Sequence, residues 1–137
     1  MAEVEPKRIL MVDDDVALLR IVREALRAVL RCEVDTSPQP EYGFELALKK
    51  KYDLLIFDFQ MPMIDGEMLF FLIEKVYSNA APPRVVPPLI LISGKADEAR
   101  AQELLKEPGV RGLLAKPFAI NRLLEKIQQT VPEIEKL

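Results

Sequence analysis

Four short apolar runs, each followed by a residue that can take part in chemistry, most constrain what this chain can fold into. The runs and the residues that follow them are 9–12 with Asp13 and Asp14, 54–57 with Asp58, 89–92 with Ser93, and 113–115 with Lys116. Apolar runs of this length, spaced among helical patterns, are typical of buried parallel strands. Because the ligands of such sheets bind at the carboxyl ends of strands, we expect these side chains to meet at one edge.

Helical periodicity fills the segments between the strands. Helices are expected over residues 16–31, 41–51, 67–77, 96–106 and 118–129, and a further strand over residues 32–36. Alternating strands and helices without an internal repeat predict an α/β fold with a doubly wound five-stranded parallel sheet. Asp15 is a plausible N-cap of the first helix. The helix over 67–77 is more apolar than one buried face needs, which favours a deeply packed core helix over a second interaction surface.

The chain is expected to be one domain with short extensions. Residues 7–130 form the domain, residues 1–6 an N-terminal extension, and residues 131–137 a tail that extends the last helix past Pro132 or frays. The N-terminus lacks the apolar segment of a signal peptide, and no apolar run approaches the ~20 residues that span a membrane. The single cysteine, Cys32, excludes an internal disulfide and fits a cytoplasmic location.

Residue content and charge exclude several classes of function. The 137 residues contain no histidine, which excludes histidine metal sites and histidine acid–base catalysis within them. The formal net charge of -3 argues against direct binding of nucleic acid, because domains that bind it usually carry a basic excess.

The carboxylates at the expected sheet edge predict a magnesium site. Mg²⁺ prefers hard oxygen ligands and binds proteins through one or two carboxylates, which Asp13, Asp14 and Asp58 can supply. Three carboxylates packed together repel one another, and a dication relieves that repulsion. The simpler interpretation is that the acidic triplet at 13–15 only caps a helix, and that Asp58 is a loop carboxylate.

The remaining residues at this edge can bind a phosphoryl group. An aspartate is a known nucleophile in phosphoryl transfer, a reaction that depends mostly on positioning and charge neutralisation. Lys116 and the Ser93 hydroxyl could contact phosphoryl oxygens, and the backbone N–H groups of Phe59 and Gly94 could add donors, with Gly94 allowing close approach. Each residue alone has a simpler explanation: Ser93-Gly94 could be only a turn, and Lys116 only a solvated lysine. Their joint placement at one edge favours a phosphoryl-binding site.

Four motifs then resemble the receiver domain of bacterial two-component response regulators, and the resemblance covers about residues 7–130. They are Ile9-Leu-Met-Val-Asp-Asp-Asp15, Asp53-Leu-Leu-Ile-Phe-Asp58-Phe-Gln-Met-Pro62-Met-Ile-Asp-Gly66, Leu91-Ile-Ser93-Gly94 and Gly112-Leu-Leu-Ala-Lys116-Pro117-Phe118. The resemblance implies a (βα)5 flavodoxin-like fold. It also implies a phosphoprotein of signal transduction rather than a metabolic enzyme, with Mg²⁺-dependent autophosphorylation from small donors and autodephosphorylation.

The same resemblance implies a role for each residue of the site. Asp58 matches the phosphoacceptor, Asp14 the direct Mg²⁺ ligand, Asp13 its partner acting through water, Gln60 a third ligand through its backbone carbonyl, Ser93 the switch hydroxyl and Lys116 the invariant lysine. Lys116-Pro117 would be a cis peptide, which an X–Pro bond makes affordable.

The implied partners follow from that chemistry. The phosphoryl donor would be a phosphohistidine on a histidine kinase or phosphotransfer protein. The output would be a contact with an unknown downstream protein, through the surface of helix 96–106, strand Val110–Ala115 and helix 118–129. A homodimer is a further possibility, and no membrane contact is expected.

Leu113 is the main departure from the family pattern, which usually has an aromatic switch residue three positions before the lysine. Because of Leu113, a second interpretation stays open, in which the chain is a receiver-like scaffold that acts without phosphorylation. Gln60 and Lys95 lie where family members tune dephosphorylation. A haloacid-dehalogenase-type phosphatase is a third interpretation, but it needs a late acidic pair for Mg²⁺, and after Lys116 the chain offers only helical or terminal glutamates.

Overall fold

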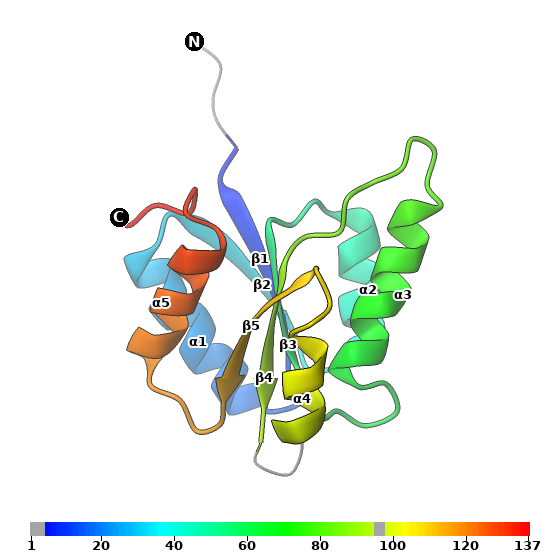
Figure 1. Ribbon diagram of the computed structural model, residues 1–137. Helices are drawn as coiled ribbons and strands as arrows, with labels where there is room; N and C mark the ends of the chain where they lie inside the picture. The colour runs from blue at the N-terminus through cyan, green and yellow to red at the C-terminus, as the bar shows by residue number, and fades with distance from the viewer. Residues whose placement is uncertain (1–4, 95–97) are drawn as a thin grey trace.

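A five-stranded sheet lies between two layers of helices in the computed structural model, which describes residues 5–94 and 98–137 (Figure 1). The elements in chain order are β1 (Lys7–Val12), α1 (Val16–Val29), β2 (Cys32–Ser37), α2 (Pro40–Lys49), β3 (Leu54–Asp58), α3 (Gly66–Ser78), β4 (Leu89–Ser93), α4 (Glu98–Leu104), β5 (Val110–Ala115) and α5 (Ile120–Thr130). This alternation confirms the α/β prediction.

The sheet is parallel throughout, and its strand order is β2-β1-β3-β4-β5. The chain runs from β1 outward to β2 and then crosses to β3 on the other side of β1. A doubly wound sheet binds its ligands where the winding reverses, beyond the carboxyl ends of the strands. In this chain the reversal lies between β1 and β3, so the topology places a crevice beside Asp13 and Asp58.

Alternate side chains of the central strands feed two separate cores. Leu10 and Phe57 face one core, which is closed by α2, α3 and α4, whereas Ile9 and Met11 face the other, which is closed by α1 and α5. Figure 1 shows the two helix layers on opposite sides of the sheet. Because both faces are covered, the central strands are apolar at consecutive positions, and this explains the continuous runs in the sequence.

Side-chain caps fix where the helices of the site begin. The Asp15 carboxylate accepts the N–H of Leu18 at 3.1 Å, which confirms the predicted N-cap of α1. Asp65 caps α3 in the same way, accepting the N–H of Met68 at 2.7 Å. These caps satisfy N–H groups that have no partner within the helix.

The C-terminal tail packs back onto the domain instead of extending α5 or fraying. Ile134 is 1% exposed in the core beneath α1 and α5. Leu30 and Lys136 form an antiparallel bridge, and the N–H of Leu137 donates to the carbonyl of Val29 at 2.9 Å. This pairing requires extended backbone at Leu30, so α1 ends two residues earlier than the periodicity predicted.

Helices α3 and α4 also differ from the sequence expectation. Leu69, Phe70 and Ile73 of α3 are buried, but Met68 and Leu72 are exposed, so α3 is only partly a core helix. Helix α4 is shorter than the expected span 96–106, and residues 95–97, including Lys95, lie outside the described residues. Within 5–94 and 98–137, no helix combines the length and apolar character needed to cross a membrane.

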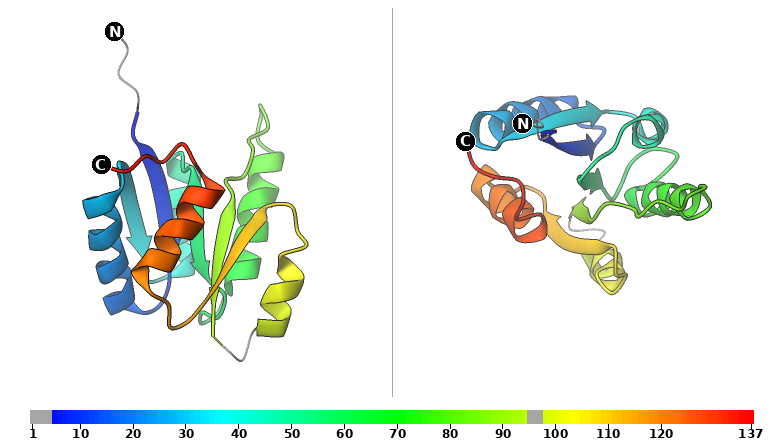
Figure 2. Two further views of the ribbon diagram at one scale, coloured as in Figure 1. Left: turned by 60° about the vertical axis from the view of Figure 1, so that its left-hand side comes forward. Right: turned by 90° about the horizontal axis from the view of Figure 1, so that it is seen from above.

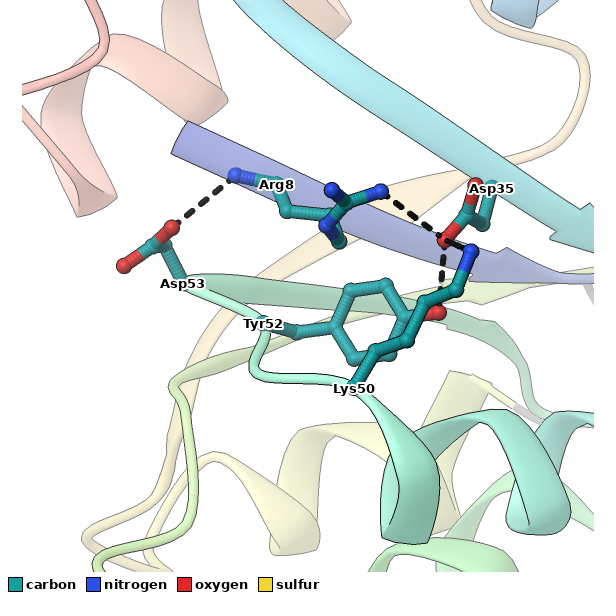
Figure 3. Close-up of polar contacts among 5 residues, drawn as sticks. All are labelled: Arg8, Asp35, Lys50, Tyr52 and Asp53. Carbon is teal, nitrogen blue, oxygen red and sulfur yellow. Dashed lines mark hydrogen bonds and ion pairs between the residues drawn. The ribbon is translucent and has the colours of Figure 1, made fainter. Parts of the chain in front are cut away.

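A polar network joins β1, β2 and the segment before β3, well apart in sequence (Figure 3). The Asp35 carboxylate accepts the Tyr52 hydroxyl at 2.7 Å and lies 3.2 Å from the Lys50 ammonium and 3.5 Å from the Arg8 guanidinium. Burial opposes ionisation of Asp35, but the Tyr52 hydroxyl and the two cations outweigh it and lower the pKa of Asp35 below its ordinary value.

Tyr52→Phe is expected to lower the free energy of unfolding at pH 7 by about 2 kcal/mol, because a hydrogen bond to a charged group is lost. The folded pKa of Asp35 lies below its unfolded value, so its contribution is present above pH ~4 and disappears as pH falls further. Urea unfolding at pH 7 and pH 3 tests this expectation. An equal loss at both pH values would contradict a role through ionised Asp35.

Candidate functional site

Adjacent strand ends bring the predicted site residues to one edge of the sheet. Asp13 directly follows β1, and Asp58 ends β3, the neighbouring strand. Ser93 ends β4 and pairs with Ala115 of β5, and the Lys116 N–H donates to the Ser93 carbonyl at 2.8 Å. The order β1-β3-β4-β5 therefore aligns all four residues in space.

The Lys116 ammonium lies between two buried carboxylates. Its Nζ is 2.9 Å from Asp13 Oδ2 and 3.5 Å from Asp58 Oδ2. Asp13 is fully buried and Asp58 is 5% exposed, whereas Asp14 is exposed. Two buried carboxylates share one cation, so the site carries excess negative charge.

Burial and the neighbouring charges shift the pKa values of Asp58, Asp13 and Lys116. Burial, and then the charges of Asp13 and Asp14, raise the pKa of Asp58 from 3.8 to about 6 despite the nearby ammonium of Lys116. Burial also raises the pKa of Asp13, although the Asp15 N–H and Lys116 hold it down. Burial disfavours the charged form of Lys116, but its ion pairs with Asp13 and Asp58 raise its pKa overall.

The carboxylate cluster fits a divalent cation. In the described part of the chain, one oxygen from each of Asp13, Asp14 and Asp58 lies within 4.8 Å of the others. Ligands of one Mg²⁺ ion are at most about 4.2 Å apart, twice the usual metal–oxygen distance, so a small contraction suffices. The buried Asp13 Oδ2 lies 2.9 Å from the Lys116 ammonium, and an oxygen of this kind is a hard ligand that a divalent cation could share.

Gly66 is a positioning residue that the sequence analysis missed. A Cβ on Gly66 would lie 2.4 Å from the carbonyl oxygen of Asp58 and 3.2 Å from the Cα of Phe59. The Gly66 N–H donates to the Phe59 carbonyl at 2.8 Å, which folds the loop back onto the end of β3. The signal in the sequence was a glycine eight residues after Asp58, at the start of a helix that already has an N-cap.

One predicted backbone feature needs correction. The Phe59 N–H donates to the Ile92 carbonyl at 2.7 Å, so strand pairing already uses it, and it is not a free donor for a ligand. Strand register decides this property, and it is not visible in a local motif. A Cβ on Gly94 would meet none of the described residues within 4 Å, and the role of Gly94 toward a phosphoryl group stays a prediction.

Other family-like features take the expected positions. The Lys116-Pro117 peptide is cis, as the resemblance implied, and Ala81-Pro82 is cis as well. Leu113 is half-buried and packs against the core that α2, α3 and α4 cover. Gln60 lies exposed in the loop after β3.

Comparison with known proteins gives the same family. The protein-family model for the response regulator receiver domain matches residues 9–128. The transcriptional regulatory protein RprY of Bacteroides fragilis is 35% identical over 124 residues, covering 90% of this chain and 49% of RprY. The probable chemotaxis protein CheY of Rhizobium etli is 27% identical over 128 residues, covering 93% of this chain and 95% of that protein.

Solved structures share the fold. Chemotaxis protein CheY4 of Vibrio cholerae superposes with a TM-score of 0.78 at 23% identity, covering 93% of this chain and 100% of CheY4. The chain spans about half the length of RprY and nearly all of the Rhizobium etli CheY. The fold, the acidic edge and the matched residues together place this chain in the response regulator receiver domain family of two-component signal transduction.

Proposed function

We propose that Asp58 accepts a phosphoryl group from a phosphohistidine of a histidine kinase or phosphotransfer protein, with Mg²⁺. The observation that carries this proposal is the position of the Asp58 carboxylate, at a strand end where it shares the Lys116 ammonium with a second buried carboxylate. Receiver domains generally accept phosphoryl groups from such partners, and the 137 residues contain no histidine to serve as an internal donor.

The transfer uses the ionised form of Asp58. A carboxylate oxygen attacks phosphorus, the phosphorus–nitrogen bond breaks, and the imidazole leaves with the bonding electron pair and takes up a proton. Because the pKa of Asp58 is about 6, most of the carboxylate is ionised near pH 7.5. Lys116 then balances charge on the phosphoryl oxygens, and the Ser93 hydroxyl and Gly94 N–H donate to them.

Asp13, Asp14, Asp58 and the Gln60 carbonyl would hold the cation. Mg²⁺ bound there supplies positive charge against the transferred group. In the absence of the cation, Lys116 is the positive charge within 4 Å of both buried carboxylates, which explains how the domain tolerates them.

The signal is proposed to leave through the surface of α4, β5 and α5, toward a downstream protein. Ser93 ends β4, and the chain continues from it toward α4, so a change in contact at Ser93 acts on the start of that surface. Leu113, on β5, has neither an aromatic ring nor a hydroxyl. This favours transmission of the change at Ser93 through altered packing rather than through rotation of an aromatic side chain.

Leu113 also supports the second candidate function, a scaffold that signals without phosphorylation. The third interpretation, a haloacid-dehalogenase-type phosphatase, loses its support. The acidic cluster found in the described residues contains no late acidic pair, and the family match is to receiver domains.

Intact-mass spectrometry after incubation with acetyl phosphate and Mg²⁺ tests the proposal. Wild type and Asp53→Asn, a matched change just before β3, are expected to carry one phosphoryl adduct, whereas Asp58→Asn carries none. Labelling of Asp58→Asn at the wild-type rate would show that another residue accepts the phosphoryl group, and Asp13 and Asp14 would be the next candidates. Absence of an adduct on the wild type, with Mg²⁺ binding confirmed by titration, would favour the scaffold.

A further inference from the structure

Helix α3 carries an exposed apolar strip that the phosphoryl site does not use. Met68, Leu72 and Val76 are 52%, 39% and 41% exposed. Met68 and Leu72 line a hollow of about 340 Å³, together with Asp65, Glu67, Phe71 and Lys75. Seen from above in Figure 2, α3 lies at an outer corner of the molecule, so this face is open to a partner.

Met68 and Leu72 of this strip, together with Asp65 and Lys75 on either side of them, have the spacing of a helix–helix seam. Asp65, Met68, Leu72 and Lys75 are separated by three, four and three residues, the spacing of a and d positions in coiled coils. With a rise of 1.5 Å per residue, Asp65 and Lys75 lie about 7.5 Å on either side of position 70, and Met68 and Leu72 about 3 Å. The seam is therefore symmetric in position and opposite in charge at its two ends.

We propose that this face binds a second copy of the chain, with the two α3 helices antiparallel about a two-fold axis at the level of position 70 along the helix. In this pairing Met68 of each copy packs on Leu72 of the other, and Asp65 meets Lys75 at both ends. A parallel pairing would instead place like charges opposite each other, so the charge pattern selects the antiparallel arrangement.

The two charged end groups are available for this contact. Asp65 uses Oδ1 to cap α3, and no described residue occupies its second oxygen. Lys75 has no ion pair with any residue of 5–94 or 98–137. Glu67, in contrast, already pairs with Arg100 of α4 and contributes nothing to the seam.

Because the seam has only four layers, the interface is at the small end of specific interfaces, and the dimer is weak and concentration-dependent. It does not depend on Asp58 accepting a phosphoryl group. Sedimentation velocity of the full chain from about 20 µM to about 1 mM is expected to show a rise in the weight-average sedimentation coefficient. Met68→Glu and Leu72→Lys are each expected to weaken self-association at least tenfold.

Mixing the two variants tests the register. The introduced glutamate of one then meets the introduced lysine of the other, while the second inner layer keeps its native Leu72–Met68 contact, so a heterodimer is expected at wild-type strength or above. Val85→Lys is the matched change. Its side chain is 92% exposed in the segment between α3 and β4, and this variant is expected to dimerise as the wild type does.

Three results would overturn the proposal. They are a wild type that stays monomeric up to about 1 mM, variants that dimerise unchanged and so use another face, and a mixture that forms no heterodimer. Circular dichroism of each variant confirms that loss of association is not loss of fold.

Discussion

Asp58→Asn is expected to raise the free energy of unfolding by about 2–3 kcal/mol at pH 7.5 in metal-free buffer. Asp58 is 5% exposed, and its burial beside Asp13 and Asp14 raises its pKa from 3.8 to about 6. The folded pKa exceeds the unfolded value, so ionising Asp58 opposes folding. The loss of folding stability caused by ionising Asp58 is absent below pH ~4. It grows between pH ~4 and pH ~6 and is constant at higher pH.

Urea unfolding in EDTA from pH 4 to pH 8 measures this difference directly. Asp14→Asn, an exposed member of the same cluster, is the matched control and is expected to gain much less stability. Lys116→Met should have the opposite effect, because it leaves two buried carboxylates without a cation. A gain for Asp58→Asn that does not change with pH would rule out ionisation as its cause.

The same measurement with Mg²⁺ present connects stability to the site. A ligand that binds only the folded state stabilises it by an amount that grows with the logarithm of one plus the ratio of the free ligand concentration to Kd. Mg²⁺ is expected to stabilise the wild type more than Asp58→Asn, so the advantage of the variant shrinks as the cation is added. An unchanged advantage at saturating Mg²⁺ would show that Asp58 is not among the ligands.

Gly66→Ala is expected to lower the free energy of unfolding by about 3 kcal/mol and to slow phosphoryl uptake at Asp58. The added methyl would lie 2.4 Å from the Asp58 carbonyl oxygen. This neighbour is backbone at the end of the central strand β3, so it cannot move aside by changing a rotamer. Relief of the clash therefore moves either the loop or Asp58 itself.

Gly94→Ala is the matched control for stability, since its methyl would meet none of the described residues within 4 Å and its φ is not positive. It is expected to change stability by less than about 1 kcal/mol, toward stabilisation, because alanine restricts the unfolded chain. Urea unfolding and the initial rate of labelling by acetyl phosphate measure both effects. Equal stability of the two alanine variants would show that the loop before α3 yields without cost.

The sequence was sufficient for the fold class and for the common location of the candidate site residues. Local periodicity placed all five strands to within a few residues, because strands covered on both faces must be apolar at consecutive positions. Asp13, Asp58, Ser93 and Lys116 could be predicted to share an edge, because parallel strands all end on the same side of their sheet. The N-cap role of Asp15 is likewise local.

Only the tertiary structure decided which groups are in contact and which are already occupied. The strand order puts β1 beside β3, which brings Lys116 within 4 Å of both buried carboxylates. Strand register occupies the Phe59 N–H, and loop packing makes Gly66 a glycine that the site requires.

The tail and α3 show the same division. Residues 131–137 were expected to extend α5 or fray, yet Ile134 is buried because α1 and α5 leave an apolar site for it. The sequence shows that α3 is more apolar than one buried face needs, but packing decides that Leu69 and Phe70 are buried while Met68 and Leu72 are exposed. A sequence determines local propensity and the order of elements, whereas burial and contact depend on residues distant in the chain, which only folding brings together.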